Sequence, residues 1–227
     1  MSVNREYKSS VFTALFNDHE ELLKLYNALT GCLLPLNTSV EIATLEDVLF
    51  TDRQNDIAFV LGDKVVILIE HQSSINENMP LRLLLYVARV YEKLIDNDSI
   101  YMRKLLRIPR PDFIVLYNGI DPFPDEKTLR LSDAYKEPPE ELTSIGGVLE
   151  LEVRVVNINE GRNEAIVSKS ERLYGYVRFI GKVRCKLNAG LDLSTSVINA
   201  VKECVEEGIL ADFLKSHSSE GAPVRCM

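Results

Sequence analysis

The sequence predicts an α/β protein in which helices flank a central mixed sheet and a helical tail follows. Residues 56–61 and 65–70 are short runs of β-branched and apolar side chains separated by Gly62 and Asp63, a pattern typical of a β-hairpin. Residues 79–96 then repeat apolar side chains at helical spacing. Beyond Asn159 the pattern is helical throughout. Both hairpin strands are almost wholly apolar, which predicts that the sheet is covered on both faces.

The composition is that of a globular chain long enough to bury a substantial core. It has 227 residues, 46% of them hydrophobic, and a net charge of −8. No apolar run approaches the roughly 18 residues that a membrane span needs, and the N-terminus has no secretory pattern. The four cysteines form no C-x-x-C pair and are expected to be reduced thiols. We therefore expect a cytoplasmic protein with no membrane partner.

The first 50 residues predict helices followed by a strand. A helical pattern over residues 8–30 is interrupted at Asp18, which with Glu21 matches a capping box, so a second helix is expected to begin there. Gly31 is expected to end that helix. The first strand is expected within residues 40–50.

An acid stands at each end of the predicted hairpin. Asp56 opens its first strand, Glu70 closes its second, and Gln72 follows two residues later. Acids at the ends of apolar strands are costly to bury unless a positive group lies between them. Two carboxylates with the amide oxygen of Gln72, or the carbonyl oxygen of His71, form a set of hard oxygen ligands suited to Mg²⁺ or Mn²⁺.

The register of the hairpin decides whether the two acids meet. If Leu61 pairs with Val65 across a three-residue loop, Asp56 faces Glu70 and both project to one side. With a two-residue loop, Asp56 faces Ile69 and the acids lie on opposite sides. The metal-site prediction depends on the first register.

The helix after the hairpin is predicted to border the acids. Asn78 is a candidate N-cap and Pro80 suits a first helical turn. The side chains expected to pack on the sheet are Leu81, Leu84, Leu85 and Ala88. A basic stripe is formed by Arg82, Tyr86, Arg89 and Lys93, either as a solvated face or as a wall that contacts phosphate.

The remaining elements are predicted more coarsely. The densest basic cluster, over residues 101–110, is either ordinary surface charge or a contact for a DNA backbone. Its basic side chains are Arg103, Lys104, Arg107 and Arg110. Strands over 112–118 and 149–158 are separated by a Pro- and Gly-rich excursion with at most short strands. Helices are expected over 163–186, 194–204 with Ser194 as N-cap, and 207–216.

Several segments of the sequence resemble those of the recombination-promoting nuclease and transposase family, which belongs to the PD-(D/E)XK nuclease superfamily. The pattern formed by Asp56, Glu70 and Gln72 is similar to the acid and acid-x-Lys signature that this superfamily carries on adjacent strands. The segments more specific to this family are RQNDIAF, IEHQSS, MPLRLLLYVARVYEKL, VVNIN and GILADFL. The resemblance extends from about Val11 to Leu214 and implies a restriction-endonuclease-like core.

The resemblance also implies roles for residues and shows two departures. It implies that Asp56 and Glu70 bind the catalytic metal and that Arg82 binds the phosphate of DNA. Arg53, which the family also has here, either binds phosphate or pairs with Asp52. Ser9 stands where the family has an acid, so either Glu6 substitutes for it or the site lacks one ligand. The final residues, GAPVRCM, also differ from the apolar and acidic helix that the family has there, which predicts a truncated tail.

Together these patterns favour a Mg²⁺-dependent endonuclease that acts on DNA. The alternatives are a non-catalytic DNA- or protein-binding remnant of a mobile-element gene, which the net charge of −8 favours, and a structural domain whose acids pair with arginines. The expected division is a nuclease-like core over residues 1–160 and a helical extension over 161–227 packed on it. The C-terminal helices either cover the sheet or form a homodimer.

Overall fold

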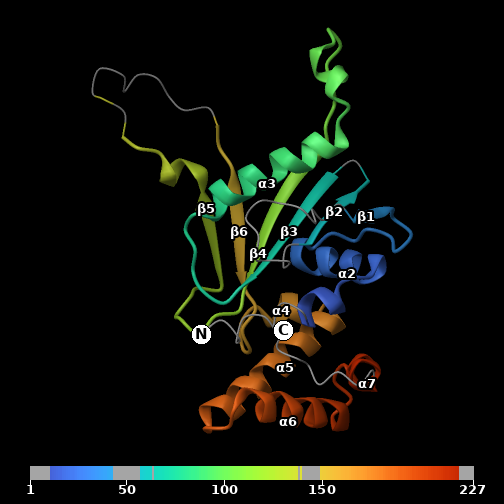
Figure 1. Cartoon of the computed structure of the whole chain (residues 1–227), viewed down its shortest axis with the longest axis vertical. Helices are drawn as coiled ribbons and strands as arrows, with labels where there is room; N and C mark the ends of the chain where they lie inside the picture. Colours follow the sequence, from blue (N-terminus) through green and yellow to red (C-terminus); the bar gives the residue numbers. More distant parts are fainter. Residues whose placement is uncertain (1–10, 43–56, 63, 138, 140–148, 220–227) are drawn as a thin grey trace. The chain divides into compact units, whose positions relative to one another are not determined.

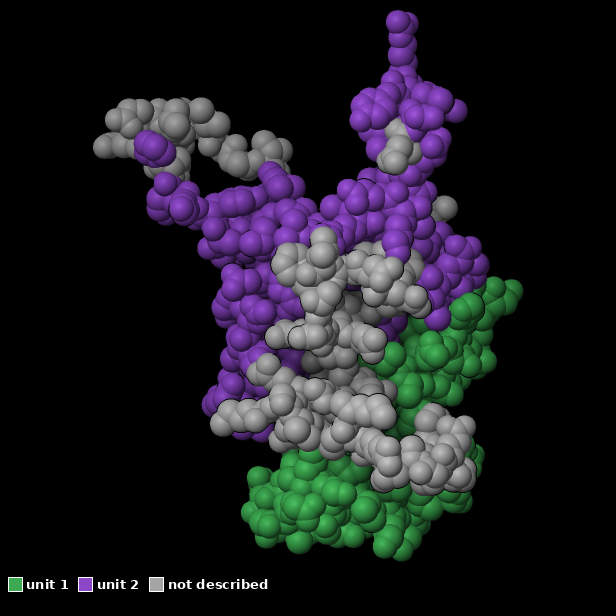
Figure 2. Space-filling view, viewed as in Figure 1, with its two compact units in different colours: residues 1–38, 158–227 green, residues 39–157 purple. Residues whose placement is uncertain are grey.

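The computed structural model describes residues 11–42, 57–62, 64–137, 139 and 149–219, with the backbone alone for residues 64–71, 97 and 217–219 (Figure 1). The chain forms two compact units (Figure 2). Unit 1 combines residues 1–38 with residues 158–227, and unit 2 is residues 39–157. The sequence-based division groups residues 1–160 in one core, whereas these units group residues 1–38 with residues 158–227.

Unit 2 contains one six-stranded mixed sheet in the order β1-β2-β3-β4-β6-β5. β3, β4 and β6 are parallel, and the other neighbours pair antiparallel. The predicted mixed α/β architecture is therefore confirmed for the described residues. The strands are β1 (Val40–Ile42), β2 (Ile57–Leu61), β3 (Lys64–Gln72), β4 (Arg110–Tyr117), β5 (Glu126–Arg130) and β6 (Glu152–Asn157).

The β2–β3 hairpin has the two-residue register. Leu61 pairs with Lys64, and Ile57 pairs with Leu68. The pairing of Leu61 with Val65, on which the predicted meeting of the two acids rested, is wrong. The physical reason is the turn, where Gly62 has a φ of +55°, a left-handed conformation typical of tight two-residue hairpins.

A β-bulge in β3 changes which side of the sheet its last residues occupy. Leu68 pairs with Ile114 and His71 with Leu116, so three steps along β3 match two steps along β4. Paired positions share a side of the sheet, and positions two apart on β4 also share a side. The extra residue therefore resets the alternation, and Gln72 lies on the side opposite to the position of Leu68.

Helix α3 (Met79–Leu94) connects β3 to β4 and runs across the sheet in Figure 1. Pro80 is in its first turn, as predicted, and Asn78 is at the N-cap although its side chain makes no capping hydrogen bond. The predicted packing face is wrong, because Leu81 and Leu85 are 45% and 47% exposed. The helix instead buries Met79, Pro80, Leu83, Val87 and Val90.

The connections around β4 contain short elements. The 3₁₀ helix η1 (Asn97–Tyr101) precedes β4. The excursion after β4 contains β5, which is a short edge strand, and the 3₁₀ helix η2 (Leu131–Ala134). The final strand, predicted over 149–158, is β6.

Unit 1 is helical in its described residues. Residues 11–15 are helical, and α2 begins after a break before His19. The labelled helices are α2 (His19–Thr30), α4 (Glu164–Val167), α5 (Glu171–Asn188), α6 (Leu193–Glu206) and α7 (Ala211–Ser219). The helix predicted over 163–186 is broken, because the Ser170 hydroxyl accepts from the Leu173 N–H and caps a new helix there. Helix α6 begins slightly earlier than predicted, since Asp192 and not Ser194 is its N-cap. Across the described residues, no helix has the length and apolar character to span a membrane.

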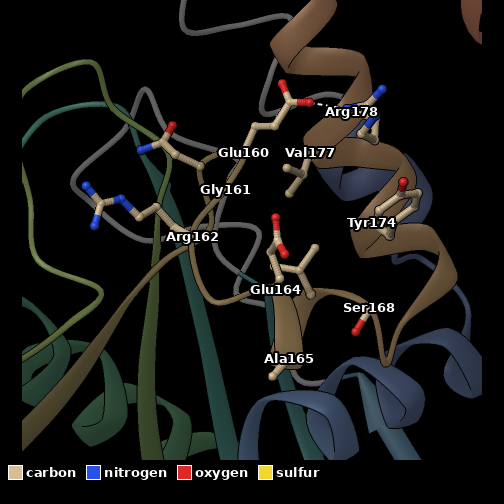
Figure 3. A pocket seen from close by; sticks show the side chains of 11 residues that line it. Glu160, Gly161, Arg162, Glu164, Ala165, Ser168, Tyr174, Val177 and Arg178 are labelled. Carbon is tan, nitrogen blue, oxygen red and sulfur yellow. Dashed lines mark hydrogen bonds and ion pairs between the residues drawn. The ribbon is translucent and has the colours of Figure 1, made fainter.

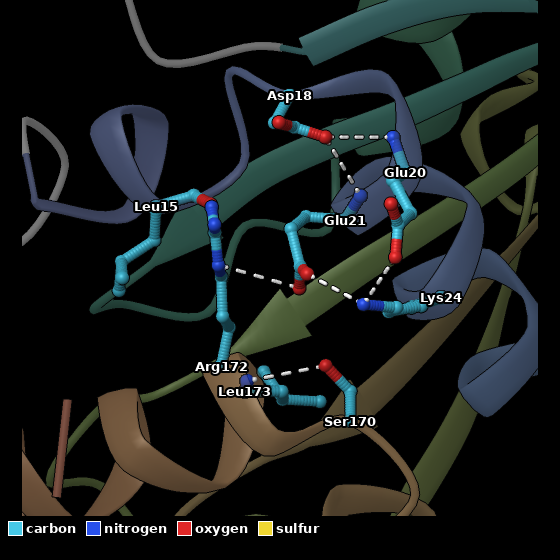
Figure 4. A network of polar contacts seen from close by, with 8 residues as sticks. All are labelled: Leu15, Asp18, Glu20, Glu21, Lys24, Ser170, Arg172 and Leu173. Atoms are coloured by element: carbon cyan, nitrogen blue, oxygen red, sulfur yellow. Dashed lines mark hydrogen bonds and ion pairs between the residues drawn. The ribbon is translucent and has the colours of Figure 1, made fainter. Parts of the chain in front are cut away.

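Contacts join residues 12–21 to helix α5 within unit 1, and Figure 4 shows the polar ones. Arg172 on α5 donates to the Leu15 carbonyl oxygen at 2.5 Å and pairs with Glu21 at 3.3 Å. The ring of Phe12 packs edge-on against Tyr176 at 5.4 Å. Asp18 caps α2, as predicted, by accepting from the Glu20 and Glu21 N–H groups. These contacts explain why the N-terminal segment belongs with the C-terminal helices.

Candidate functional site

Three buried side chains form a row at the carboxyl ends of the parallel strands. Gln72 ends β3 and pairs with Tyr117 at the end of β4, which in turn pairs with Asn157 at the end of β6. Their exposed fractions are 7%, 1% and 3%. Paired positions on parallel strands point to the same side, so the three side chains share one side of the sheet. In sheets of this kind, ligands bind outside the carboxyl ends of the strands.

Gln72 is held by the first turn of α3. Its amide nitrogen contacts the Met79 sulfur at 2.7 Å, and a guanidinium nitrogen of Arg82 contacts the same sulfur at 3.4 Å. Met79 is 1% exposed, whereas Arg82 is half-buried. Sulfur is a weak acceptor, so Met79 acts mainly as packing that orients both donors. Gln72 and Arg82, two residues that the sequence predicted for one site, therefore contact the same side chain.

The loop after β4 closes the other end of the row. The Tyr117 hydroxyl donates to the Asp121 carbonyl oxygen at 2.9 Å, and its ring packs against Phe123 at 4.5 Å. The Asn157 side-chain amide donates to the Phe123 carbonyl oxygen at 3.1 Å. A Cβ at Gly119 would be 2.3 Å from the Tyr117 hydroxyl, so this close approach requires glycine. Hydrogen bonds from Tyr117 and from Asn157 thus hold this loop in place.

The connection between β3 and α3 is tied to the edge of the sheet. Glu77 in this connection pairs with Lys127 of β5 at 2.7 Å. On the same edge, Arg154 of β6 pairs with Glu126 of β5 at 2.6 Å. Hydrogen bonding from Arg154 lowers the pKa of Glu126. Both acids are at least two-fifths exposed, so each pair contributes little to stability. The Glu77–Lys127 pair mainly positions the connection.

Several predicted site residues lie outside the described part of the chain. These are Glu6, Ser9, Arg53 and Asp56. The backbone of Glu70 is in β3, between Leu68 and His71 where the bulge occurs, but its side chain is also outside. The side chains that the structure describes contain no group of three or more His, Cys, Asp or Glu suited to a metal ion. Gln72 and Arg82 are thus the two predicted site residues whose side-chain contacts are described.

Unit 1 contains a cavity of about 590 Å³ that sequence reasoning missed (Figure 3). Glu160 pairs there with Arg178, and Figure 3 shows Glu164 and Tyr174 on its wall. The Arg178 Nε is buried without a hydrogen-bond partner among the described residues. The sequence signal is the turn-forming run Asn159–Asn163, where Gly161 and Asn163 both have positive φ. The lining contains two acids, Glu160 and Glu164, and two arginines, Arg162 and Arg178. Its charges therefore favour neither an anionic nor a cationic ligand.

Fold and site together define an α/β protein whose buried polar row lies at the carboxyl ends of parallel strands. The family model described as "Putative transposase, YhgA-like" matches residues 43–185, which is more than half of the chain. The chain therefore belongs to the YhgA-like transposase family. Searches of curated proteins and of solved structures found no match.

Proposed function

We propose that the protein is a metal-dependent DNA phosphodiesterase with its active site at the carboxyl end of β3. The observation that supports this most is the convergence of Gln72 and Arg82 on Met79 at the end of a parallel strand. An amide and a guanidinium at the carboxyl end of a parallel strand suit an anionic substrate. Membership of a transposase family favours DNA as that substrate.

The metal ligands of the proposal are Asp56 and Glu70, with the Gln72 amide oxygen or the His71 carbonyl oxygen. This donor set consists of hard oxygens, which fits Mg²⁺ or Mn²⁺. The proposal requires β2 to continue through Asp56, because alternation from Ile57 then gives that position the same side as Gln72. It also requires the bulge to turn Glu70 toward that side. Strand alternation alone no longer separates the acids, because the bulge interrupts it.

When bound, the metal would activate a water and stabilise charge on the phosphoryl oxygens. In the proposed mechanism Arg82 binds the scissile phosphate and orients it, since guanidinium donors match phosphate oxygens. Gln72 orients the attacking water, because a neutral amide can donate and accept but cannot take up the proton. Met79 excludes bulk water from the Gln72 amide. Arg53 is proposed as a second phosphate contact.

A non-catalytic DNA- or protein-binding remnant is the second candidate. The observation that favours it is Ser9, which removes one expected anionic ligand. In that case Gln72 and Arg82 would serve packing and binding alone.

Plasmid nicking by the purified protein tests the proposal. We expect weak cleavage with Mg²⁺ or Mn²⁺ that chelator abolishes, and loss of cleavage in Asp56→Ala and Glu70→Ala. Gln72→Ala should slow cleavage less, because it removes an orienting group without removing charge. Wild-type cleavage by Asp56→Ala would contradict the proposed site, and an inactive pure wild type would favour the binding remnant.

A further inference from the structure

An arm projects from unit 2 between α3 and β4. We define the arm as residues 98–110, which extend away from the sheet at the top of Figure 1 and of Figure 2. Its base is closed, because the Tyr91 hydroxyl on α3 donates to the Pro109 carbonyl oxygen at 2.5 Å. Asp96 caps η1 by accepting from the Asp98 N–H. These two hydrogen bonds hold the arm in a defined conformation at its base.

The arm exposes large apolar side chains in a continuous stretch. Tyr101 is 88% exposed and Leu105 is 71% exposed. The full exposed set is Ile100, Tyr101, Met102, Leu105, Leu106 and Ile108. Scattered exposed apolar residues are normal, but a contiguous group of this size marks an interaction surface.

Exposed cations alternate with these apolar side chains. Arg103, Lys104, Arg107 and Arg110 are all exposed, against one acid in the arm, Asp98. Within the described residues, none of the four takes part in an ion pair. By contrast, Lys127 and Arg154 on the sheet edge are paired. A positive arm on a chain of net charge −8 indicates a polyanionic partner.

Duplex DNA matches this combination of side chains. Phosphates bind unpaired Arg and Lys side chains, and apolar side chains such as Leu, Ile and Met enter the minor groove and wedge between base steps. A contact between the arms of two copies is less well matched, because two arms of like charge would repel each other. The choice of DNA as the partner rests on the proposed function. The arm extends that proposal by showing how the protein would hold its substrate.

We propose that the arm binds duplex DNA, with Arg103, Lys104 and Arg107 on phosphates and Tyr101, Met102 and Leu105 wedged in the minor groove. The wedge bends the duplex, and the cations make affinity depend on salt. The arm thereby supplies non-specific affinity for the substrate, because contacts to phosphate carry no sequence information.

Fluorescence anisotropy with a labelled duplex in chelator tests the arm without requiring cleavage. The triple variant Arg103→Gln/Lys104→Gln/Arg107→Gln should bind more weakly. The slope of its log affinity against log salt should fall by about 0.9 for each phosphate that the variant no longer neutralises. The matched control is Lys136→Gln/Lys169→Gln/Lys202→Gln, which removes the same charge from exposed sites elsewhere and should keep the wild-type slope. Equal reductions in both variants would overturn the proposal.

The apolar residues need a separate readout. Tyr101→Ala/Met102→Ala/Leu105→Ala should reduce the DNA bend measured by energy transfer between labelled ends, with the salt slope unchanged. Unaltered DNA binding together with a loss of dimer in sedimentation, or with a loss of binding to anionic vesicles, would overturn the proposal in favour of a second copy or a membrane surface. If the wild type binds through the arm but does not cleave, only the nuclease proposal fails. If it cleaves while arm variants bind normally, only the arm proposal fails.

Discussion

Gly119→Ala should destabilise unit 2 because the loop after β4 leaves no room for a methyl group. The added Cβ would be 2.3 Å from the Tyr117 hydroxyl oxygen, 2.4 Å from Cζ and 2.6 Å from Cε2. Ordinary contacts between such atoms are about 3.5–4.0 Å. Gly119 has no positive φ, so the effect is steric.

The cost follows from how firmly Tyr117 is held. Its ring is 1% exposed and packs against Phe123, and its hydroxyl bonds to the Asp121 carbonyl oxygen. Overpacking typically costs about 1–3 kcal/mol, and losing the hydrogen bond adds about 1 kcal/mol, so we expect about 2–4 kcal/mol. This is a large part of the stability of an ordinary domain.

Urea unfolding followed by circular dichroism measures this destabilisation, and hydrogen exchange assigns it to β4. Gly181→Ala is the matched control, because its Cβ would approach only the Glu160 side-chain end at 2.5 Å, which can rotate away. Alanine is also favoured over glycine inside α5 by about 1 kcal/mol. A Gly119→Ala protein within about 0.5 kcal/mol of wild type would refute the packing of this loop.

Three further predictions test other parts of the structure. Leu83→Ala should cost about 2–4 kcal/mol in urea unfolding, because Leu83 is 5% exposed, whereas Leu81→Ala at a 45% exposed position should cost under about 1 kcal/mol; equal costs would contradict the observed face of α3. Burial raises the pKa of the Cys204 thiol to about 11, so only about one Cys204 thiol in a thousand is ionised at about pH 8. Mass spectrometry after alkylation should therefore show rapid labelling of exposed Cys185 and none of Cys204 in the folded protein. Hydrogen bonding from Arg154 lowers the pKa of Glu126 below its ordinary value of 4.5, so Glu126 contributes stability above that value and loses it as the pH falls through the lowered pKa. The stability difference between wild type and Glu126→Gln should thus vanish in acid, and a difference that grows there would contradict the pairing.

Local sequence signals predicted the elements whose determinants are local. Asp18 and Gly31 define the ends of α2, and Pro80 defines the start of α3, because capping side chains and backbone preferences act over a few residues. The hairpin was also predicted, but its register depends on the left-handed turn at Gly62. The bulge between Leu68 and His71 has no local signature, since it appears only in the pairing of β3 with β4.

Non-local packing accounts for what the sequence could not predict. Helix α3 carries two apolar stripes, and only the sheet beneath it selects the stripe with Leu83 and Val87. The bounds of β5, a short strand within the predicted excursion, were not predicted because Leu129 is its single buried side chain. In the candidate site, Gln72 and Arg82 were predicted, whereas Tyr117 and Asn157 were not. Each is a polar residue at the end of an apolar strand. This pattern indicates a shared site only when the two strands are known to be neighbours in the sheet.

Titration of Mn²⁺ followed by electron paramagnetic resonance tests the central claim most directly, because it detects the proposed ligands without requiring cleavage. Wild-type protein should bind Mn²⁺ and release it to Mg²⁺, and Asp56→Ala and Glu70→Ala should each lose this binding. Gln72→Ala should weaken it less, and Ser9→Asp should strengthen it if the N-terminal segment borders the site. Binding by Asp56→Ala and Glu70→Ala equal to that of wild type, or no binding by wild type, would contradict a metal site at the carboxyl end of β3.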